Sequence, residues 1–315
     1  MVRFVGLDVH KPFVQACVVD ANGRTLLEQR VPTTQAALTA FAQQQLRRGD
    51  QVALEATTNC WAVAKLLRPF VDQVAVSNPL QTKAIAQAKI KTDKVDAHAL
   101  AQLLRCDYLP TVWMPDDKTQ TLRTLTHHRS ALVAERTRLK NRIHSVLQQL
   151  LRPVDYDLFS KKGRVLLRRF ATRFGGMELP QTERALIDSD LRLLDHVEAE
   201  IATLDQELVQ HAYTDERVKL LMTLPGVDYT IAQTLLAALG DLSRFPDGDH
   251  AASYLGLVPS THQSGNHCYH GRITKQGNTH ARWMLVQAAQ RMATHPGPLG
   301  GPKGEWYRCR IGSCG

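Results

Sequence analysis

The chain has 315 residues, 43% of them hydrophobic and 22% charged, which is enough for two or three domains with a sizeable core. No apolar run is long enough to span a bilayer, and the N-terminus lacks the apolar region of a signal peptide, so we expect a cytoplasmic protein with no membrane partner. The formal net charge of +9 favours a polyanionic partner such as nucleic acid.

The first third of the chain alternates between strand and helix patterns. Three strand patterns come first, with the turn signal Asn22-Gly23 between the second and the third, and further strands then alternate with helices. This is the order of a ribonuclease-H-like, or RuvC-like, α/β domain, which we expect over residues 1–110. The predicted strands are 2–9, 13–19, 25–31, 52–55 and 71–77, and the predicted helices are 34–47 and 61–67.

Four acidic residues stand at the ends of these elements. Asp8 and Glu55 lie where strands should end, and Asp93 and Asp96 are three residues apart at a helix start, so both point to one side of that helix. Carboxylate oxygens are the ligands that Mg²⁺ needs when a phosphodiester is attacked. The set predicts a Mg²⁺ site in an enzyme that cuts or joins nucleic acid.

Each acid also has an ordinary structural explanation. Asp93 and Asp96 fit the cap and first turn of a helix, where the free amides and the helix dipole favour a negative charge. Asp8 and Glu55 fit strand ends that face solvent. Only the combination of the four on a basic chain favours catalysis.

Residues 111–212 read as a basic, helical region with coiled-coil character. A helix over 116–151 has its apolar residues at heptad spacing, and a second helix over 182–211 repeats the pattern, so the two can pair with each other or across a dimer. The basic residues of the region favour contact with a phosphate backbone, a plain exposed surface being the alternative. They include Arg123, Arg138, Lys140 and Arg142 on the first helix, with Arg168 and Arg169 in the segment between the two.

Residues 213–292 predict a mainly α domain. Two helical runs flank Leu224-Pro225-Gly226-Val227, which is the pattern of a helix-hairpin-helix whose turn amides around Gly226 can hold a phosphate. A polar loop over 260–278 follows, and then a helix over 279–292. In the loop, Ser264 precedes a glycine, with Arg272 and Lys275 close behind. A hydroxyl beside cations can attack a phosphodiester and have the resulting charge stabilised.

The same loop is rich in possible zinc ligands, namely His262, His267, Cys268 and His270. A polar loop with several histidines is the simpler interpretation, because the six cysteines of the chain form no C-x-x-C pair. Residues 293–315 are rich in glycine and proline, so we expect them to be disordered.

Five motifs, in this order, together resemble the transposases of insertion-sequence family one-hundred-ten, the group that includes the pilin-gene-inverting recombinase. The resemblance runs from about residue 3 to residue 292. The motifs are Gly6-Leu7-Asp8-Val9-His10-Lys11, Glu55-Ala56-Thr57, Lys91-Thr92-Asp93-Lys94-Val95-Asp96-Ala97, Leu224-Pro225-Gly226-Val227, and Ser264-Gly265 with Gly271-Arg272-Ile273-Thr274-Lys275-Gln276-Gly277-Asn278.

The resemblance implies a RuvC-like domain with a Mg²⁺-binding tetrad, a coiled-coil middle that helps dimers form, and a C-terminal transposase domain. It implies that Ser264 is a nucleophile that becomes linked to DNA at a site shared between subunits, with Ser260 and Ser253 as fallback candidates. It also implies a structured bridge RNA that pairs with target and donor DNA, and a homo-oligomer, either a dimer or a tetramer.

In one respect the chain departs from the family. Members usually continue past the helix that ends near Met292 with a further basic helical segment, whereas here a Gly- and Pro-rich stretch follows. This is the pattern expected of a truncated or frameshifted copy with an incomplete C-terminal domain. Two alternatives therefore stay open: a RuvC-like metal-dependent nuclease that forms no covalent intermediate, and an inactive nucleic-acid-binding remnant.

Overall fold

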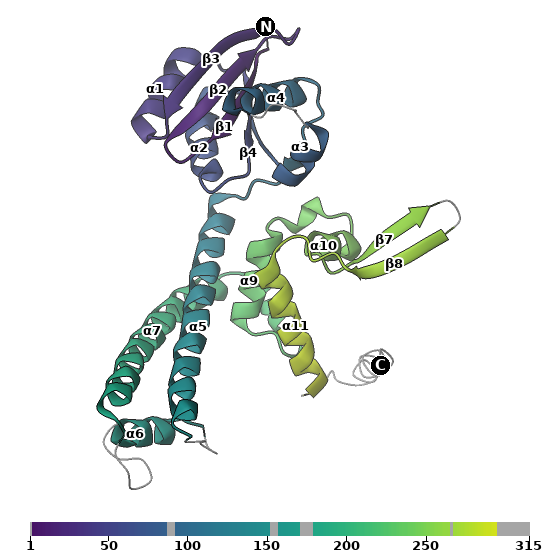
Figure 1. Cartoon of the computed structure of the whole chain (residues 1–315). Coiled ribbons are helices and arrows are strands. Elements are labelled where there is room, and N and C mark those ends of the chain that lie inside the picture. The colour runs from purple at the N-terminus through teal and green to yellow at the C-terminus, as the bar shows by residue number, and fades with distance from the viewer. Residues whose placement is uncertain (1, 87–91, 152–156, 171–178, 265–266, 295–315) are drawn as a thin grey trace. The chain divides into compact units, whose positions relative to one another are not determined.

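The computed structural model describes residues 2–86, 92–151, 157–170, 179–264 and 267–294 (Figure 1). The chain divides into two compact units, Met1–Met114 and Pro115–Gly315. The expectation of a mixed α/β N-terminal region followed by a mainly helical remainder is confirmed. None of the described helices is both long and apolar enough to cross a membrane. The predicted disorder of the tail concerns residues that, from 295 on, lie outside the described part.

The N-terminal unit is built on one mixed sheet with the strand order β3-β2-β1-β4-β5-β6. Strands β1, β2 and β3 are antiparallel neighbours, β4 and β5 continue parallel to β1, and β6 is antiparallel to β5. Helix α3 and strand β6 were not predicted. The elements are β1 (Phe4–Val9), β2 (Phe13–Val19), β3 (Thr25–Pro32), α1 (Gln35–Gln45), β4 (Gln51–Glu55), α2 (Cys60–Leu67), the 3-10 turn η1 (Arg68–Phe70), β5 (Gln73–Ser77), α3 (Pro79–Ile85), α4 (Asp93–Arg105) and β6 (Thr111–Val112).

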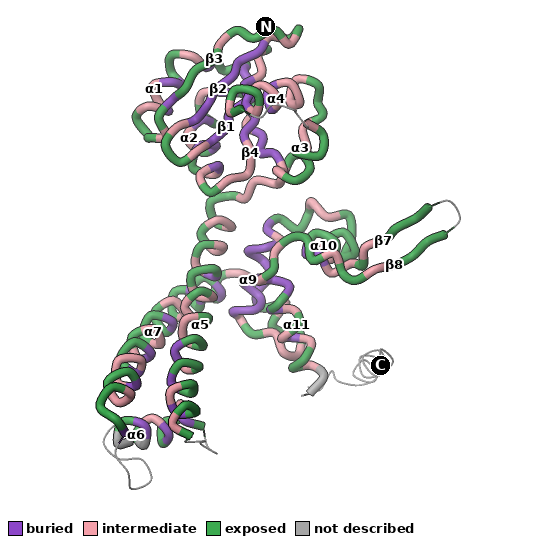
Figure 2. Tube along the Cα trace, in the orientation of Figure 1, coloured by how far each residue is buried: buried purple, intermediate pink, exposed green. Residues whose placement is uncertain are grey.

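The two faces of β1 carry different kinds of residue. Val5, Leu7 and Val9 point to one face, where they join the main core of the unit with residues of α1 and α2. The residues between them point to the opposite face, because side chains alternate along a strand. Figure 2 shows β1, β2 and β4 as the buried centre of the unit. The sheet is thus covered on both sides, by α1 and α2 on one face and by α4 on the other.

Helix α4 lies very close to β1 because Gly6 has no side chain. A Cβ atom built at Gly6 would lie 1.9 Å from the carbonyl oxygen of Ala97 and 2.6 Å from the backbone nitrogen of Ala101. Ala97 and Ala101 are fully buried and pack with Cys17 of β2 in a small cluster of their own. A strand glycine opposite two helix alanines therefore sets the depth at which α4 sits on the sheet.

The second unit begins with two long antiparallel helices, α5 (Asp117–Gln149) and α7 (Gln181–Tyr213), linked through α6 (Lys161–Phe170) (Figure 1). Arg129 pairs with Asp205, and Arg142, further along α5, pairs with Asp190, which comes earlier on α7. The two helices therefore run in opposite directions. Both long helices were predicted. Their facing sides bury leucine and isoleucine residues of the heptad pattern, including Leu139, Ile143, Leu194, Ile201 and Leu208.

The rest of the unit packs around α9, in which nearly every residue is buried. The predicted polar loop over 260–278 is wrong in part, because 259–264 and 267–273 form an antiparallel two-stranded hairpin. Nearly all of its described residues are exposed (Figure 2), and its sequence lacks the alternation of apolar and polar residues by which a strand is recognised. The elements are α8 (Glu216–Met222), α9 (Tyr229–Leu239), η2 (Leu242–Arg244), α10 (Gly248–Tyr254), β7 (Pro259–Ser264), β8 (His267–Ile273) and α11 (Thr279–Thr294).

The contact at Gly6 generates the first prediction. Gly6→Ala forces α4 away from β1 or distorts the sheet, so we expect it to lower the free energy of unfolding by about 1–3 kcal/mol, measured by denaturant titration. Gly49→Ala is the matched control, because a Cβ at Gly49 meets nothing within 4 Å. Equal stability of the two variants would show that α4 does not depend on this contact.

Candidate active site

Asp8 and Glu55 lie side by side at the ends of two parallel strands. Strand β1 pairs in parallel with β4, with Leu7 opposite Leu54, so the next residue on each strand points to the same face. That face is the one covered by α4. Asp8 is buried, with 8% of its surface exposed, whereas Glu55 is half-buried.

Helix α4 brings the other two acids to this edge. Its N-cap is Thr92, whose hydroxyl oxygen accepts a hydrogen bond from the Val95 amide at 3.3 Å. Neither aspartate is therefore the cap, although both lie in the first turn, where the helix dipole favours a negative charge. The N-cap role therefore belongs to Thr92, while the first-turn explanation still applies to both Asp93 and Asp96.

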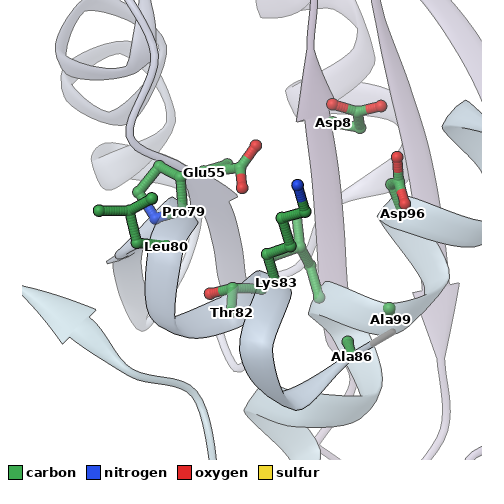
Figure 3. Close-up of a pocket in the computed structure, with 10 residues that line it drawn as sticks. Asp8, Glu55, Pro79, Leu80, Thr82, Lys83, Ala86, Asp96 and Ala99 are labelled. Atoms are coloured by element: carbon green, nitrogen blue, oxygen red, sulfur yellow. The ribbon is translucent and has the colours of Figure 1, made fainter. Parts of the chain in front are cut away.

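One cavity of about 360 Å³ joins three of the four acids. Asp8, Glu55 and Asp96 line it together with residues of α3, and their carboxylates surround a common space in Figure 3. Asp93 does not line this cavity. It lines a neighbouring hollow with Arg30, whose guanidinium lies 3.3 Å from its Oδ2 atom.

His10 links the two sides of the acidic cluster. Its Nε2 atom lies 3.0 Å from Asp8 Oδ2 and 3.3 Å from Asp93 Oδ1. In the described part of the chain, Asp8, His10 and Asp93 are the group of three whose ligand atoms all lie within 4.8 Å of one another. Sequence analysis missed His10 as a site residue. The signal was present, because residues two apart on a strand share a face.

Lys83 is a second residue that sequence analysis missed. Its side chain extends from α3 into the space between Glu55 on one side and Asp8 and Asp96 on the other (Figure 3). Helix α3 begins directly after β5, where Asn78 caps the amide of Leu80 at 3.1 Å. The Asn-Pro helix start was readable in the sequence, but the direction of Lys83 depends on how α3 packs.

The electrostatics of Asp8 favour a bound cation. Burial raises the pKa of the Asp8 carboxyl, the neighbouring His10 acts to lower it, and the charges of Asp96 and Asp93 raise it further. A carboxylate that is buried close to others is unfavourable unless a positive charge is near. The carboxylate oxygens at this cavity are therefore suited to a hard divalent ion, which prefers oxygen ligands.

Ser264 is the last residue of β7, and it is exposed. The hairpin register sets it directly opposite His267, and both line a shallow hollow with His262 and Tyr269. Its neighbours Gly265 and Asn266 lie outside the described residues. Of the fallback candidates, Ser260 is on β7 against Gly271, and Ser253 is exposed on α10.

The four possible zinc ligands do not gather at one point of the hairpin. His262 stacks on Tyr269, whereas His270 Nδ1 lies 3.0 Å from Thr261 Oγ1 on the other face of the ribbon. Cys268 Sγ and His270 Nε2 are 4.0 Å apart. In the described part of the hairpin these residues do not form a cluster of three ligands.

Most of the predicted phosphate-binding residues on α5 and α6 have partners inside the chain. Arg142 and Arg168 pair with acids of α7, Asp190 and Asp195 respectively. Arg138 pairs with Glu135 at 2.5 Å, and Arg123 donates to the carbonyl oxygens of Ala237 and Ala238 at the end of α9. Lys140 lies over the ring of Phe159, and burial, together with the charge of Arg136, lowers its pKa. The side chain of Arg169 lies outside the described residues.

The remaining predicted residues lie in or near turns. Gly226, between α8 and α9, has φ +80°, and a Cβ there would lie 2.6 Å from the carbonyl oxygen of Ala288, so this turn requires glycine. Arg272 is exposed on β8. Lys275 follows the hairpin with φ +56°, and its amide donates to the Gly256 carbonyl at 3.2 Å.

The raised pKa of Asp8 generates a prediction about stability. The folded state binds this proton more tightly than the unfolded state does, so without metal the stability that Asp8 contributes falls as the pH rises through its titration. In EDTA at neutral pH, we expect Asp8→Asn to melt at the same temperature as the parent chain or higher. Millimolar Mg²⁺ should raise the melting temperature of the parent but not of Asp8→Asn.

Asp72→Asn is the control for this measurement, because Asp72 is an exposed acid of the same unit, away from the cavity. It should respond to Mg²⁺ as the parent does. An equal response of Asp8→Asn would remove Asp8 from the metal site.

Two family models and several known proteins match this chain. Residues 5–151 match a transposase family model of the IS110 DEDD type, and residues 218–300 match the model described as transposase IS116/IS110/IS902 family. The transposase for insertion sequence element IS1111A of Coxiella burnetii is 27% identical to this chain, and the match covers 98% of this chain and 83% of the length of that transposase.

Two further relatives agree with these matches. The insertion element IS116 protein of Streptomyces clavuligerus is 25% identical, over 94% of this chain and 86% of its own. The pilin gene-inverting protein of Moraxella bovis is 27% identical, over 83% of this chain and 74% of its own. The chain therefore belongs to the IS110 family of transposases, enzymes that cut and move DNA.

Proposed function

We propose that this protein moves or inverts a DNA segment by cutting and rejoining strands with a metal-binding acidic tetrad and a serine nucleophile. The observation that carries the proposal is the single cavity lined by Asp8, Glu55 and Asp96, with Asp93 joined to Asp8 through His10. Three carboxylates from two strands and one helix at one cavity are costly for stability unless a cation is bound there.

In this proposal the N-terminal unit is a RuvC-like nuclease domain. Support comes from the three antiparallel strands followed by two parallel ones, and from the acids at the carboxyl ends of β1 and β4. The carboxyl edge of parallel strands is a common place for active sites in α/β folds. The order of elements along the chain, three strands and then strands alternating with helices, is the one expected from the sequence.

Asp8, Glu55, Asp93 and Asp96 would hold Mg²⁺ in this proposal. When bound, the metal supplies Lewis-acid stabilisation of the charge that develops on phosphodiester oxygens. His10 holds Asp8 and Asp93 in place by its contacts to both. The Lys83 ammonium, which faces the same cavity, would balance the carboxylates or contact a DNA phosphate.

The serine step would use the β7–β8 hairpin. The Ser264 hydroxyl gives its proton to a ring nitrogen of His267, the residue opposite it, and its Oγ atom forms a bond to the scissile phosphorus. The bond from that phosphorus to one neighbouring deoxyribose oxygen breaks, and this oxygen takes a proton from water. Cross-strand partners in a hairpin are close enough for such a transfer.

The helical unit would arrange nucleic acids and subunits. The α5–α7 pair is proposed to be a coiled coil that supports a dimer or tetramer, and the α8–α9 turn at Gly226 a helix-hairpin-helix. A structured bridge RNA would select the DNA sites, as the family resemblance implies, with exposed cations such as Arg272 and Lys275 near the backbone. The enzyme would act in the cytoplasm, where bacterial DNA lies.

A second candidate function is a metal-dependent nuclease that uses water instead of serine. It is favoured by one observation: the cavity lined by Asp8, Glu55 and Asp96 lies entirely within the N-terminal unit, so the proposed metal ligands need no residue of the second unit. The two candidates differ in one product. Only the serine mechanism leaves protein covalently attached to DNA.

The tetrad generates a prediction about cleavage. Asp8→Asn, Glu55→Gln and Asp96→Asn each remove one negative ligand, and we expect strand cleavage with Mg²⁺ on cognate DNA to fall by about 10²-fold or more. RNA binding should persist, and Asp72→Asn should cleave normally. Cleavage by Asp8→Asn at the parent rate would exclude the tetrad from the mechanism.

The hairpin generates a prediction about the covalent adduct. Ser264→Ala should abolish the protein–DNA adduct detected on a denaturing gel. His267→Gln should slow adduct formation, because it removes the proposed proton acceptor. Ser243→Ala, which removes an exposed serine of η2 outside the hairpin, should form adduct normally. An adduct that persists in Ser264→Ala and is lost in Ser260→Ala or Ser253→Ala would transfer the role to that serine. Cleavage by the parent chain with no adduct at all would establish the nuclease alternative.

A further inference from the structure

The second unit contains a cavity of about 240 Å³ that the proposed chemistry does not use. It lies where α5, the start of α9 and α11 meet. On α11, Trp283, Gln287 and Arg291 line it at intervals of four residues, so they form one stripe along that helix. On α5, Arg129 and Arg136 line the opposite side.

Trp283 presents an aromatic surface to solvent. It is 50% exposed, which is unusual for so large an apolar side chain. On one side its ring lies nearly parallel to the ring of His280, with an interplanar angle of 20° and centroids 6.3 Å apart. His280 in turn packs near His127 of α5. The indole is thus supported from behind, while half of its surface stays open.

The His280 ring supports the indole without placing a positive charge behind it. Both of its ring nitrogens are buried and have no hydrogen-bond partner among the described residues. Burial lowers its pKa, and the nearby charges of His127 and Arg129 act in the same direction, so the neutral form of the ring is favoured. A neutral ring behind the indole holds it in place without adding a charge that would compete with the cations around the cavity.

The charges around the cavity are mainly positive. Arg129 is paired with Asp205, and the Asp228 carboxylate caps α9 by accepting from the Ile231 amide at 2.9 Å. Within the described part of the chain, Arg136 has no acidic partner. Arg291 adds a third guanidinium to the lining, and Asp228 is the one acid of that lining. An anionic ligand is therefore favoured over a neutral or cationic one.

We propose that this cavity binds a single-stranded nucleotide segment, with a base stacked on Trp283 and its phosphate between Arg136 and Arg291. An aromatic plane beside guanidinium groups is the combination by which proteins hold unpaired bases and their backbone. The interior of a duplex would not fit as well, because its bases are already stacked on both faces. An acidic peptide would satisfy the arginines but would leave the indole without a planar partner.

The inference rests on the proposed function only in that the ligand is nucleic acid; it does not depend on the tetrad or on Ser264. The test therefore measures binding alone. It uses the full chain carrying Asp8→Asn, in EDTA, so that no strand is cut. Fluorescence anisotropy of labelled dT15 and rU15 gives the affinity at several salt concentrations.

Trp283→Leu should weaken binding about tenfold, because it removes the stacking surface but keeps an apolar side chain. Trp283→Phe should restore most of the affinity. Arg136→Gln should reduce the slope of log K against log salt concentration by about 0.7, the value for one lost phosphate contact on a single strand. Thermal melting and circular dichroism verify that each variant is folded.

Matched controls come from the same unit. Tyr213→Leu removes an aromatic side chain that is 78% exposed on α7, and Arg192→Gln removes an exposed arginine of that helix. Both should bind like the parent. If Trp283→Leu weakens the binding of dT15 alone, the site takes a DNA strand, and if it weakens the binding of rU15 alone, the site takes RNA. If it weakens the binding of both, the site accepts either strand. Each of these results supports the proposal.

Three results would overturn the proposal. The first is parent-like affinity in both Trp283→Leu and Arg136→Gln. The second is an equal loss in the control variants. The third is competition by a poly-glutamate peptide at the same concentration as the oligonucleotide, which would mean an acidic peptide site. Failure of the tetrad would instead appear as cleavage by Asp8→Asn with Mg²⁺ present, so the two failures are distinguishable.

Discussion

Helix α4 lies so close to β1 that a methyl group at Gly6 would overlap the carbonyl oxygen of Ala97. The same helix carries Asp93 and Asp96, and the same strand face carries Asp8 two residues beyond the glycine. The distance between the acids of the helix and those of the sheet is thus set by a backbone contact that has no flexible side chain in it. Such a rigid contact keeps the ligands of a metal site at a fixed spacing.

The acids that this contact brings together repel one another, and the surrounding residues offset part of that repulsion. His10 lies between Asp8 and Asp93, Arg30 approaches Asp93 from β3, and Lys83 extends into the cavity from α3. The Arg30 pair is exposed and contributes little to stability. Burial still raises the pKa of Asp8 despite these groups. A bound divalent cation would offset the remaining repulsion between these carboxylates. Metal binding would then affect both the stability of the N-terminal unit and the proposed DNA cleavage.

Much of this fold was predictable, because short apolar runs and the Asn22-Gly23 turn indicated the strands, and apolar residues at heptad spacing indicated α5 and α7. The approach of Asp8 to Glu55 followed from parallel strands ending together. The position of Asp93 outside the cavity could not be predicted in this way. Residues three apart on a helix differ by about 60° around its axis, so Asp93 and Asp96 need not line the same space. The partners of Arg142 and Arg168 lie on a distant helix, and the hairpin has no apolar pattern, so neither could be predicted from local sequence.

The central claim is that the acids at positions 8, 55, 93 and 96 hold one divalent metal centre. Anomalous diffraction from crystals of the full chain grown with Mn²⁺ tests it most directly, because Mn²⁺ takes the same oxygen ligands as Mg²⁺ and its position is observed without a model of the reaction. The account predicts an anomalous peak in the cavity beside Asp8, within ligand distance of Glu55 and Asp96. A peak at another place in the chain, with none at this cavity, would contradict it.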